Sequence, residues 1–543
     1  MFQPNNFKVK KMKKLLILSA SMLILSSGSA YAQLVQTSEI DQNGDGNNAT
    51  VDQTLGQEGL SDINQVGDTN TADVTQSENL IGSNIFTVPG NVADIDQIGN
   101  NQSASITQVN EVTPGTGPTN RSTISQEDDG SGLTTANGFT LEATSTQNGT
   151  GNTGDIVQTG SDNFAIAEQN GQTNTSVITQ ENIDNRAFLN EQGFNFNLNG
   201  NDNDSTITQT GQGNVARVDQ DGDFLISDIN QSGDGNRARV RGQNASNNLS
   251  TIIQDGNNND ADVNDQGAEP GTANLGSNND SLILQTGDDN LATLNQTGNG
   301  NDSTITQDGF SDEAFVSQTG DGNISTTTQE ASGSDNTISI TQSGSDGSSD
   351  VTQNGGTNNV ATLLQAGLNN SSSITQTGNN NVAFVDQALE DNSSIVIQEG
   401  DDNNANVDQT GVVGESVEIL QIGTGNDSDL FDTGDDNASD ILQTGTFNAA
   451  LVTQEGFDNL SEVLQTGDTN EAYVTQTGLN NFSYITQQGD SNVADVTQGS
   501  DDNLSTIFQD GTSNLATVNQ SATFGNVSNI TQVGTSNIST VVQ

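Results

Sequence analysis

Near its carboxyl end the chain reads QTGTFNAALVTQ (residues 443–454), QEGFDNLSEVLQ (454–465) and QTGDTNEAYVTQ (465–476). Each segment fits Gln-x-Gly-x-x-Asn-x-(Ala/Ser)-x-(Val/Ile/Leu)-x-Gln, and the glutamines recur nearly every eleven residues. The small residue alternates between Ala and Ser along the chain, as in Ala450 and Ser461. The full repeat is therefore 22 residues long and consists of two halves of eleven residues. A fixed period of this size indicates a solenoid.

Each half-repeat has one constant and one variable face when it is extended. Alternate residues of a strand point to the same side, and the constant side carries Asn470, Ala472, Val474 and Gln476 in one half. The residues between them differ from half to half, so the constant side is predicted to be the interior. Regular glycines and β-branched residues disfavour a helix.

The x-Gly-x-x segments between strands favour tight turns in which glycine takes a positive φ. Strand, turn, strand and turn then form one coil, and coils stack about 4.8 Å apart. Buried amides need hydrogen-bond partners, which stacking supplies as side-chain ladders. The predicted fold is therefore an all-β solenoid, a cross-β stack of strand-turn-strand coils. The predicted ladder residues are Gln443, Asn448, Gln454, Asn459, Gln465, Asn470, Gln476, Asn481, Gln487, Asn492, Gln498, Asn503, Gln509, Asn514, Gln520, Asn537 and Gln543. The predicted turn glycines are Gly445, Gly456, Gly467, Gly478, Gly489, Gly511 and Gly534.

The composition limits both the fold and the chemistry. The chain has 543 residues, 29% of them hydrophobic, and a formal charge of −60. This composition is also typical of disordered chains, although a solenoid needs only a narrow apolar stripe. Whether the monomer folds before it assembles stays open. The chain contains no His and no Cys, which excludes Ser-His and Cys-His catalysis and nitrogen or thiolate metal sites. We expect no enzyme and no cofactor.

Residues 1–32 read as a secretory signal peptide. An apolar run at 15–25 follows a basic region, and Ala30-Tyr31-Ala32 fits a small-x-small cleavage site. Met12 is an alternative initiator. The apolar run is too short to span a bilayer, so we expect an exported protein without membrane insertion.

The charge of the mature chain excludes some partners. All lysines lie in the signal region, which leaves six arginines against 71 acidic residues. Such a chain is not expected to bind nucleic acid phosphates or anionic lipid surfaces. Arg237, Arg239 and Arg241 share the variable face of a half-repeat whose closing Gln is replaced by Gly242. They are interpreted as local relief of acidic repulsion, with a small recognition patch as the alternative.

The repeats vary in regularity along the chain. Residues 33–42 hold a partial repeat or an export tag, and 43–146 hold irregular repeats with insertions that contain Pro89, Pro114 and Pro118. These prolines are expected in loops, because proline cannot donate to a strand ladder. Whether the 77–146 insertions interrupt the solenoid stays open. Residues 147–543 form the regular array, and the chain holds about forty half-repeats in all.

The paired half-repeat resembles the curlin repeat of curli, the functional amyloid fibres of Gram-negative bacteria. The family pattern is Ser-x5-Gln-x-Gly-x-x-Asn-x-Ala-x3-Gln, and its Gln, Gly, Asn, Ala and Gln fall on Gln465, Gly467, Asn470, Ala472 and Gln476. The slot of the leading Ser holds Asn459, and Ser follows at Ser461.

The resemblance implies assembly and secretion partners. It implies self-assembly into cross-β fibres at the cell surface and in the biofilm matrix, a nucleator subunit, an outer-membrane secretion pore and periplasmic chaperones. The chain is longer and more acidic than the usual curlin subunit, which leaves a major or a nucleating role open.

Three functions other than a fibre each fit part of the sequence. Calcium binding has Asp- and Gly-rich turns in its favour, but the nonapeptide repeat of calcium-loaded β-rolls is missing. Ice binding needs a regular outward Thr array, and the outward residues are irregular. A monomeric acidic surface adhesin or stalk, able to bind divalent cations, needs capping coils, whereas the last half-repeat ends mid-pattern at Gln543. The predicted function is a secreted subunit of curli-like extracellular fibres for adhesion and biofilm, with residues 514–543 as the docking edge.

Overall fold

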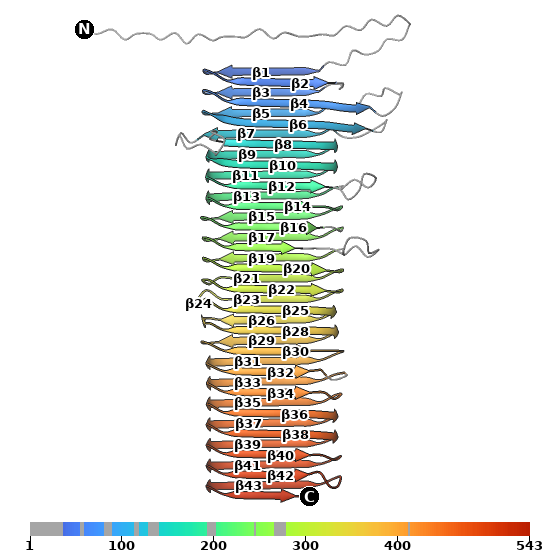
Figure 1. The fold of residues 1–543 in the computed structure, drawn as a ribbon, viewed down its shortest axis with the longest axis vertical. Helices are drawn as coiled ribbons and strands as arrows, with labels where there is room; N and C mark the ends of the chain where they lie inside the picture. The colour runs from blue at the N-terminus through green and yellow to red at the C-terminus, as the bar shows by residue number, and fades with distance from the viewer. Residues whose placement is uncertain are drawn as a thin grey trace, which may run out of the picture. The chain divides into compact units, whose positions relative to one another are not determined.

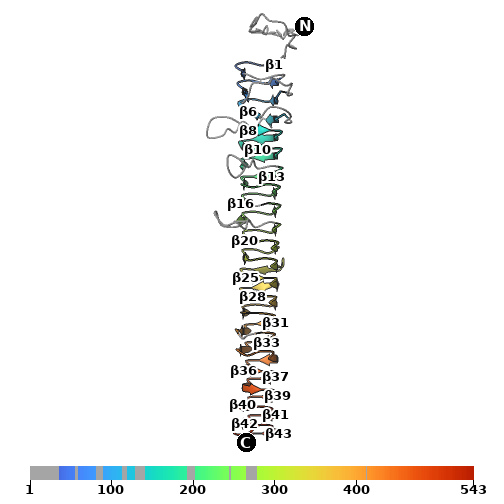
Figure 2. The same ribbon diagram turned by 90° about the vertical axis from the view of Figure 1, so that its right-hand side faces the viewer.

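The computed structural model describes residues 36–54, 59–80, 90–112, 119–128, 141–192, 202–243, 246–264, 278–410 and 413–543. Every regular element in these residues is a β-strand. The chain divides into two compact units: unit 1 comprises Met1–Thr173 and Gln180–Asp184, and unit 2 comprises Asn174–Thr179 and Asn185–Gln543. Each unit is a parallel β-solenoid of stacked coils, which confirms the predicted fold class (Figures 1 and 2). The signal sequence at 1–32 lies outside the described residues.

Unit 1 consists of two parallel sheets, and consecutive strands along the chain alternate between them (Figure 1). One sheet contains β1 (Thr37–Asn43), β3 (Leu60–Val66), β5 (Val92–Ile98), β7 (Arg121–Asp128) and β9 (Thr153–Ser161). The other contains β2 (Asn48–Thr54), β4 (Thr71–Leu80), β6 (Gln102–Val112), β8 (Leu141–Thr150) and β10 (Asn163–Gln172). β1 covers most of the 33–42 segment and pairs in register with β3, so this part of the segment takes part in the stack.

The insertions between residues 77 and 146 do not interrupt the stack of unit 1. β4 pairs with β6 and β6 pairs with β8 in parallel register. The ladder also continues, because Gln76 Nε2 donates to Gln108 Oε1 at 2.9 Å and Gln108 Nε2 donates to Gln147 Oε1 at 2.8 Å. The predicted loop prolines, Pro89, Pro114 and Pro118, lie outside the described residues.

Unit 2 repeats the same two-sheet arrangement, and β11 (Thr175–Ile183) has residues in both units. Sheet A of unit 2 contains β13 (Asp204–Gln212), β15 (Ile226–Ser232), β17 (Leu249–Asp255), β19 (Asp280–Thr286), β21 (Asp302–Gln307), β23 (Ile324–Gln329), β26 (Ser348–Asn354), β29 (Ser371–Thr377), β31 (Ser393–Asp401), β33 (Ser416–Thr424), β35 (Ala438–Thr446), β37 (Leu460–Asp468), β39 (Phe482–Asp490), β41 (Leu504–Thr512) and β43 (Val527–Thr535). Sheet B contains β12 (Arg186–Gln192), β14 (Val215–Gln220), β16 (Arg237–Gln243), β18 (Asp260–Asn264), β20 (Leu291–Thr297), β22 (Glu313–Thr319), β25 (Thr337–Ser345), β28 (Val360–Leu368), β30 (Val382–Gln387), β32 (Asn404–Gln409), β34 (Asp427–Asp432), β36 (Ala449–Phe457), β38 (Glu471–Leu479), β40 (Val493–Gln498), β42 (Leu515–Gln520) and β44 (Ile538–Val542). A short pair at one turn edge contains β24 (Gly333–Ser334) and β27 (Gly356–Thr357).

The core lies between the two sheets of each coil. In β38 the inward Ala472, Val474 and Gln476 are buried, while the outward Glu471 and Thr475 are exposed. The constant face of the repeat is therefore the interior, as predicted. Each fully buried valine contributes about 1.5–3 kcal/mol through the hydrophobic effect, so a single aliphatic layer per strand suffices once many coils are stacked.

The turns contain two left-handed positions. Gly467 has φ 115° and Thr469 has φ 57°. A Cβ at Gly467 would lie 2.2 Å from the carbonyl oxygen of Gly489 in the next coil, so both the dihedral angle and the stacking require glycine. The second position carries Thr, Asn, Ser and even Phe447, and the sequence did not reveal it. Its strain is offset by a backbone hydrogen bond, as from Thr469 N to Thr446 O at 2.8 Å.

Candidate functional site: the stacked amide ladders

The inward glutamines join successive coils of unit 2 in one direction. In sheet B, Gln454 Nε2 donates to Gln476 Oε1 at 2.9 Å, and Gln476 Nε2 donates to Gln498 Oε1 at 2.9 Å. Gln476 Nε2 also donates to the carbonyl oxygen of Leu460 in sheet A at 3.0 Å. Each glutamine therefore links its coil both to the next coil and to the opposite sheet.

The inward asparagines run in the opposite sense. Asn470 Nδ2 donates to Asn448 Oδ1 of the preceding coil at 3.1 Å and to the carbonyl oxygen of Gly489 at 2.8 Å. Asn470 Oδ1 accepts the backbone N–H of Asn492 at 3.1 Å. Because a backbone N–H can only donate, this bond fixes which amide atom is the oxygen. A coil with complete ladders thus presents glutamine donors and asparagine acceptors toward its carboxyl-terminal neighbour.

The structure places the predicted residues in four such columns. The two glutamine columns contain Gln443, Gln465, Gln487 and Gln509 in sheet A and Gln454, Gln476, Gln498, Gln520 and Gln543 in sheet B. The two asparagine columns contain Asn448, Asn470, Asn492, Asn514 and Asn537 at one turn edge and Asn459, Asn481 and Asn503 at the other. All seven predicted turn glycines have positive φ: Gly445, Gly456, Gly467, Gly478, Gly489, Gly511 and Gly534. These contacts lie within one chain, and a role between chains remains a proposal.

Sequence reasoning missed two ladder members near the carboxyl end. Gln532 Oε1 accepts from Gln509 Nε2 at 2.8 Å, and Asn526 Nδ2 donates to Asn503 Oδ1 at 3.0 Å. An extra residue in the half-repeat between Gln520 and Gln532 shifted the pattern. The signal was present, because Gln532 lies eleven residues before Gln543.

Four buried acids stand where neighbouring coils have amides, and these were also missed. Asp312 and Glu415 occupy asparagine positions, and Glu191 and Asp432 occupy glutamine positions. All four have an exposed fraction of 0%. Burial raises the pKa of Asp312 to about 6, and burial also raises the pKa values of Glu415 and Asp432. An acid at a repeat position that elsewhere holds an amide is the sequence signal that identifies them.

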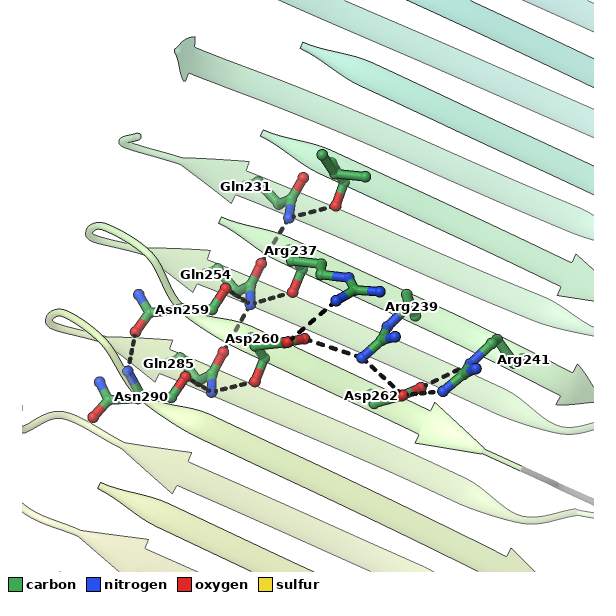
Figure 3. A network of polar contacts seen from close by, with 11 residues as sticks. Gln231, Arg237, Arg239, Arg241, Gln254, Asn259, Asp260, Asp262, Gln285 and Asn290 are labelled. Carbon is green, nitrogen blue, oxygen red and sulfur yellow. Dashed lines mark hydrogen bonds and ion pairs between the residues drawn. The ribbon is translucent and has the colours of Figure 1, made fainter. Parts of the chain in front are cut away.

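The arginines form an ionic network on the outward face of sheet B (Figure 3). Arg239 Nη2 lies 3.0 Å from Asp262 Oδ2 and 3.3 Å from Asp260 Oδ1. Arg237 Nη1 lies 3.7 Å from Asp260 Oδ2, and Arg241 pairs with Asp262. β16 thus supplies the cations and the adjacent β18 the anions. The charges compensate each other within the chain, which favours local relief of repulsion over a recognition patch.

The expectation that Gly242 replaces the closing glutamine of this half-repeat is wrong. The register between β14 and β16 shifts at a bulge, so Gln220 pairs with Gln243. Gln220 Nε2 donates to Gln243 Oε1 at 3.0 Å. A bulge accommodates one extra residue in a strand, and the ladder continues across it.

Within the described ranges, no group of three or more His, Cys, Asp or Glu side chains is arranged to hold a metal ion. No helix in the same ranges is long and apolar enough to cross a membrane.

Comparison with known families identifies the repeat. The curlin associated repeat matches residues 149–181, 276–309, 309–344, 344–378, 434–467, 445–478, 456–489 and 467–499. The chain is a curlin-repeat protein. No curated protein matches it significantly over its sequence. Curlin-repeat proteins are structural rather than enzymatic, and the family suggests an extracellular surface protein.

Proposed function

We propose that this curlin-repeat protein is a secreted structural subunit that assembles, coil on coil, into cross-β fibres of the extracellular matrix, where it serves adhesion and biofilm cohesion. The observation that carries the proposal is the repetition of the contact between coils. The same glutamine bonds, 2.8–3.0 Å long, join successive coils of unit 2 from Gln443 to Gln543. A coil from a second copy carries the same donors and acceptors as the next coil of the same chain, so it can form the same ladder hydrogen bonds.

The direction of the ladders sets how copies would join. Glutamine Nε2 and asparagine Oδ1 face the carboxyl-terminal neighbour, while glutamine Oε1 and the backbone N–H of asparagine face the amino-terminal one. Asparagine Nδ2 donates to both neighbours. Two copies satisfy these groups only when they stack head to tail in parallel register. Such a heterologous contact does not close on itself and therefore generates a filament.

The remaining partners rest on the family resemblance. A nucleator subunit, an outer-membrane secretion pore and periplasmic chaperones would deliver the chain to the cell surface of a Gram-negative bacterium. The acidic charge of −60 supports a partner set without nucleic acid and without membrane insertion.

A seeded thioflavin-T time course on the mature chain, followed by fibre diffraction, tests the proposal. We expect a lag phase that preformed fibres abolish, and reflections near 4.7 and 10 Å from the strand and sheet spacings. A β-rich chain that stays monomeric for days in the presence of seeds would contradict it. That result would favour a monomeric surface stalk.

A further inference from the structure

Two buried acids interrupt the amide ladders in a single coil of unit 2. Glu415 immediately precedes β33, and its backbone N–H donates to Asn392 Oδ1 at 3.2 Å, as an asparagine at this position would. Asp432 ends β34, where it pairs with Gln409 of β32 and Gln454 of β36. This coil lies between the curlin matches at 344–378 and 434–467.

The glutamine ladder of sheet B breaks at this coil, whereas that of sheet A does not. Within the described residues, Gln454 Oε1 is buried without a hydrogen-bond partner, because Asp432 has no amide to donate. In the same coil, Gln421 Nε2 donates to Gln443 Oε1 at 3.0 Å. The coil therefore keeps its backbone pairing and one ladder, and loses the side-chain link of the other sheet.

The two carboxyl groups lie close together in the core, where burial and the charge of Asp432 raise the pKa of Glu415. Asp432 Oδ1 accepts Asn437 Nδ2 at 2.7 Å and Gly434 N at 3.3 Å. Among the described residues, no N–H or hydroxyl group donates to either oxygen of Glu415 or to Asp432 Oδ2. A bond between two carboxyl groups requires a proton on one of them.

The surroundings of the pair supply negative charge and no cation. Asp408 and Asp435 lie close enough to raise the pKa of Glu415 further, after burial and the charge of Asp432. No Lys, Arg or His follows Arg241 in the sequence, so no basic side chain of the later coils can compensate the pair. Ionising both carboxyl groups in this buried site costs a large free energy, because their negative charges repel each other and neither is solvated.

We propose that Glu415 and Asp432 form a buried proton-binding site that makes the stability of their coil depend on pH. When the pair holds a proton, a carboxyl–carboxyl bond stands in for the missing amide link. When both groups ionise, their repulsion opens the coil and weakens the junction between the preceding and following coils. The proton is bound by the native coil and released on opening, so stability falls as pH rises above the range in which unfolded carboxyls titrate.

This site differs from the general repulsion of the outward acids. Outward carboxylates occur on many coils and are screened by salt, whereas the buried pair acts on one coil and is shielded from solvent. The two effects separate when the pH dependence of this coil is compared with that of a coil with complete ladders, such as β38 and β39 around Gln476.

Hydrogen exchange of the full chain between pH 5 and pH 8, corrected for intrinsic exchange rates, tests the proposal. One pKa unit is a tenfold change in an equilibrium, so we expect the opening constant of β34 amides to rise by about 100-fold relative to β38 amides. The double variant Glu415→Asn/Asp432→Gln restores both amides and should abolish the difference. Glu418→Gln, a control on the exposed face of β33, should leave it intact.

Four results would overturn the proposal. The first is equal pH dependence in β34 and β38, and the second is an unchanged difference in the double variant. The third is full protection of β34 at pH 8 on addition of 1 mM calcium chloride, which would assign the pair to a metal ion instead. A double variant without β-structure at pH 5 would likewise contradict it, because neighbouring coils use the same amides.

Discussion

Removal of one ladder glutamine gives the sharpest test of the interior. In the variant Gln476→Ala, Gln498 Oε1 loses the Nε2 donor that lies 2.9 Å away, and Gln454 Nε2 loses an acceptor at 2.9 Å. Gln454 Nε2 keeps the carbonyl oxygen of Ala438 at 3.0 Å. The principal cost is therefore one buried acceptor without a donor, together with the space left by the side chain.

The expected magnitude follows from these contacts. A buried polar group left unpaired costs about 1–3 kcal/mol, and the partly collapsed cavity adds to this. We expect Gln476→Ala to reduce the free energy of unfolding of its coil by about 2–4 kcal/mol. The matched control is Thr475→Ala, whose side chain is exposed on the opposite face and whose effect should stay within about 0.5 kcal/mol.

Hydrogen exchange of β38 and its neighbours measures both variants under identical conditions. A loss of 2–4 kcal/mol corresponds to an increase in the opening constant by a factor of about 30 to 1,000. In the assembly assay, Gln476→Ala should also slow fibre growth more than Thr475→Ala. Equal exchange rates in the two variants would refute the assignment of Gln476 to an interior ladder that stabilises its coil.

Two further predictions concern the turns and the buried acid Asp312. Gly467→Ala should destabilise the chain by at least about 2 kcal/mol, because a Cβ would lie 2.2 Å from the next coil's carbonyl oxygen. Gly213→Asn should be tolerated, since no described heavy atom lies within 4 Å of its added Cβ; similar urea midpoints for the two variants would contradict this. Burial raises the pKa of Asp312 from 3.8 to about 6, so the native state holds the proton more tightly and stability should fall between pH 4 and 6. Asp312→Asn should therefore gain about 3 kcal/mol over the wild type at pH 7 and little at pH 4 in urea unfolding, whereas a pH-independent difference would count against it.

The repeat pattern predicted the strands, the interior face and the turn glycines, because each depends on local spacing. Alternation places Val474 and Gln476 on one face of any extended strand, and glycine tolerates the positive φ that the turn needs. The insertions at 77–146 could not be interpreted in this way. Whether β4 and β6 stack across them depends on pairing between residues distant in sequence.

The sequence by itself determined that the chain is a solenoid of 22-residue coils with an amide-lined interior, since only stacking satisfies so many inward Gln and Asn side chains. Only the tertiary structure decided the direction of the ladders, the bulge that brings Gln243 into line and the burial of Glu415 and Asp432 close together in one coil. These features depend on which side chain lies above which in the neighbouring coil. A one-residue change in register moves every such contact to a different partner, and spacing along one strand does not reveal that register.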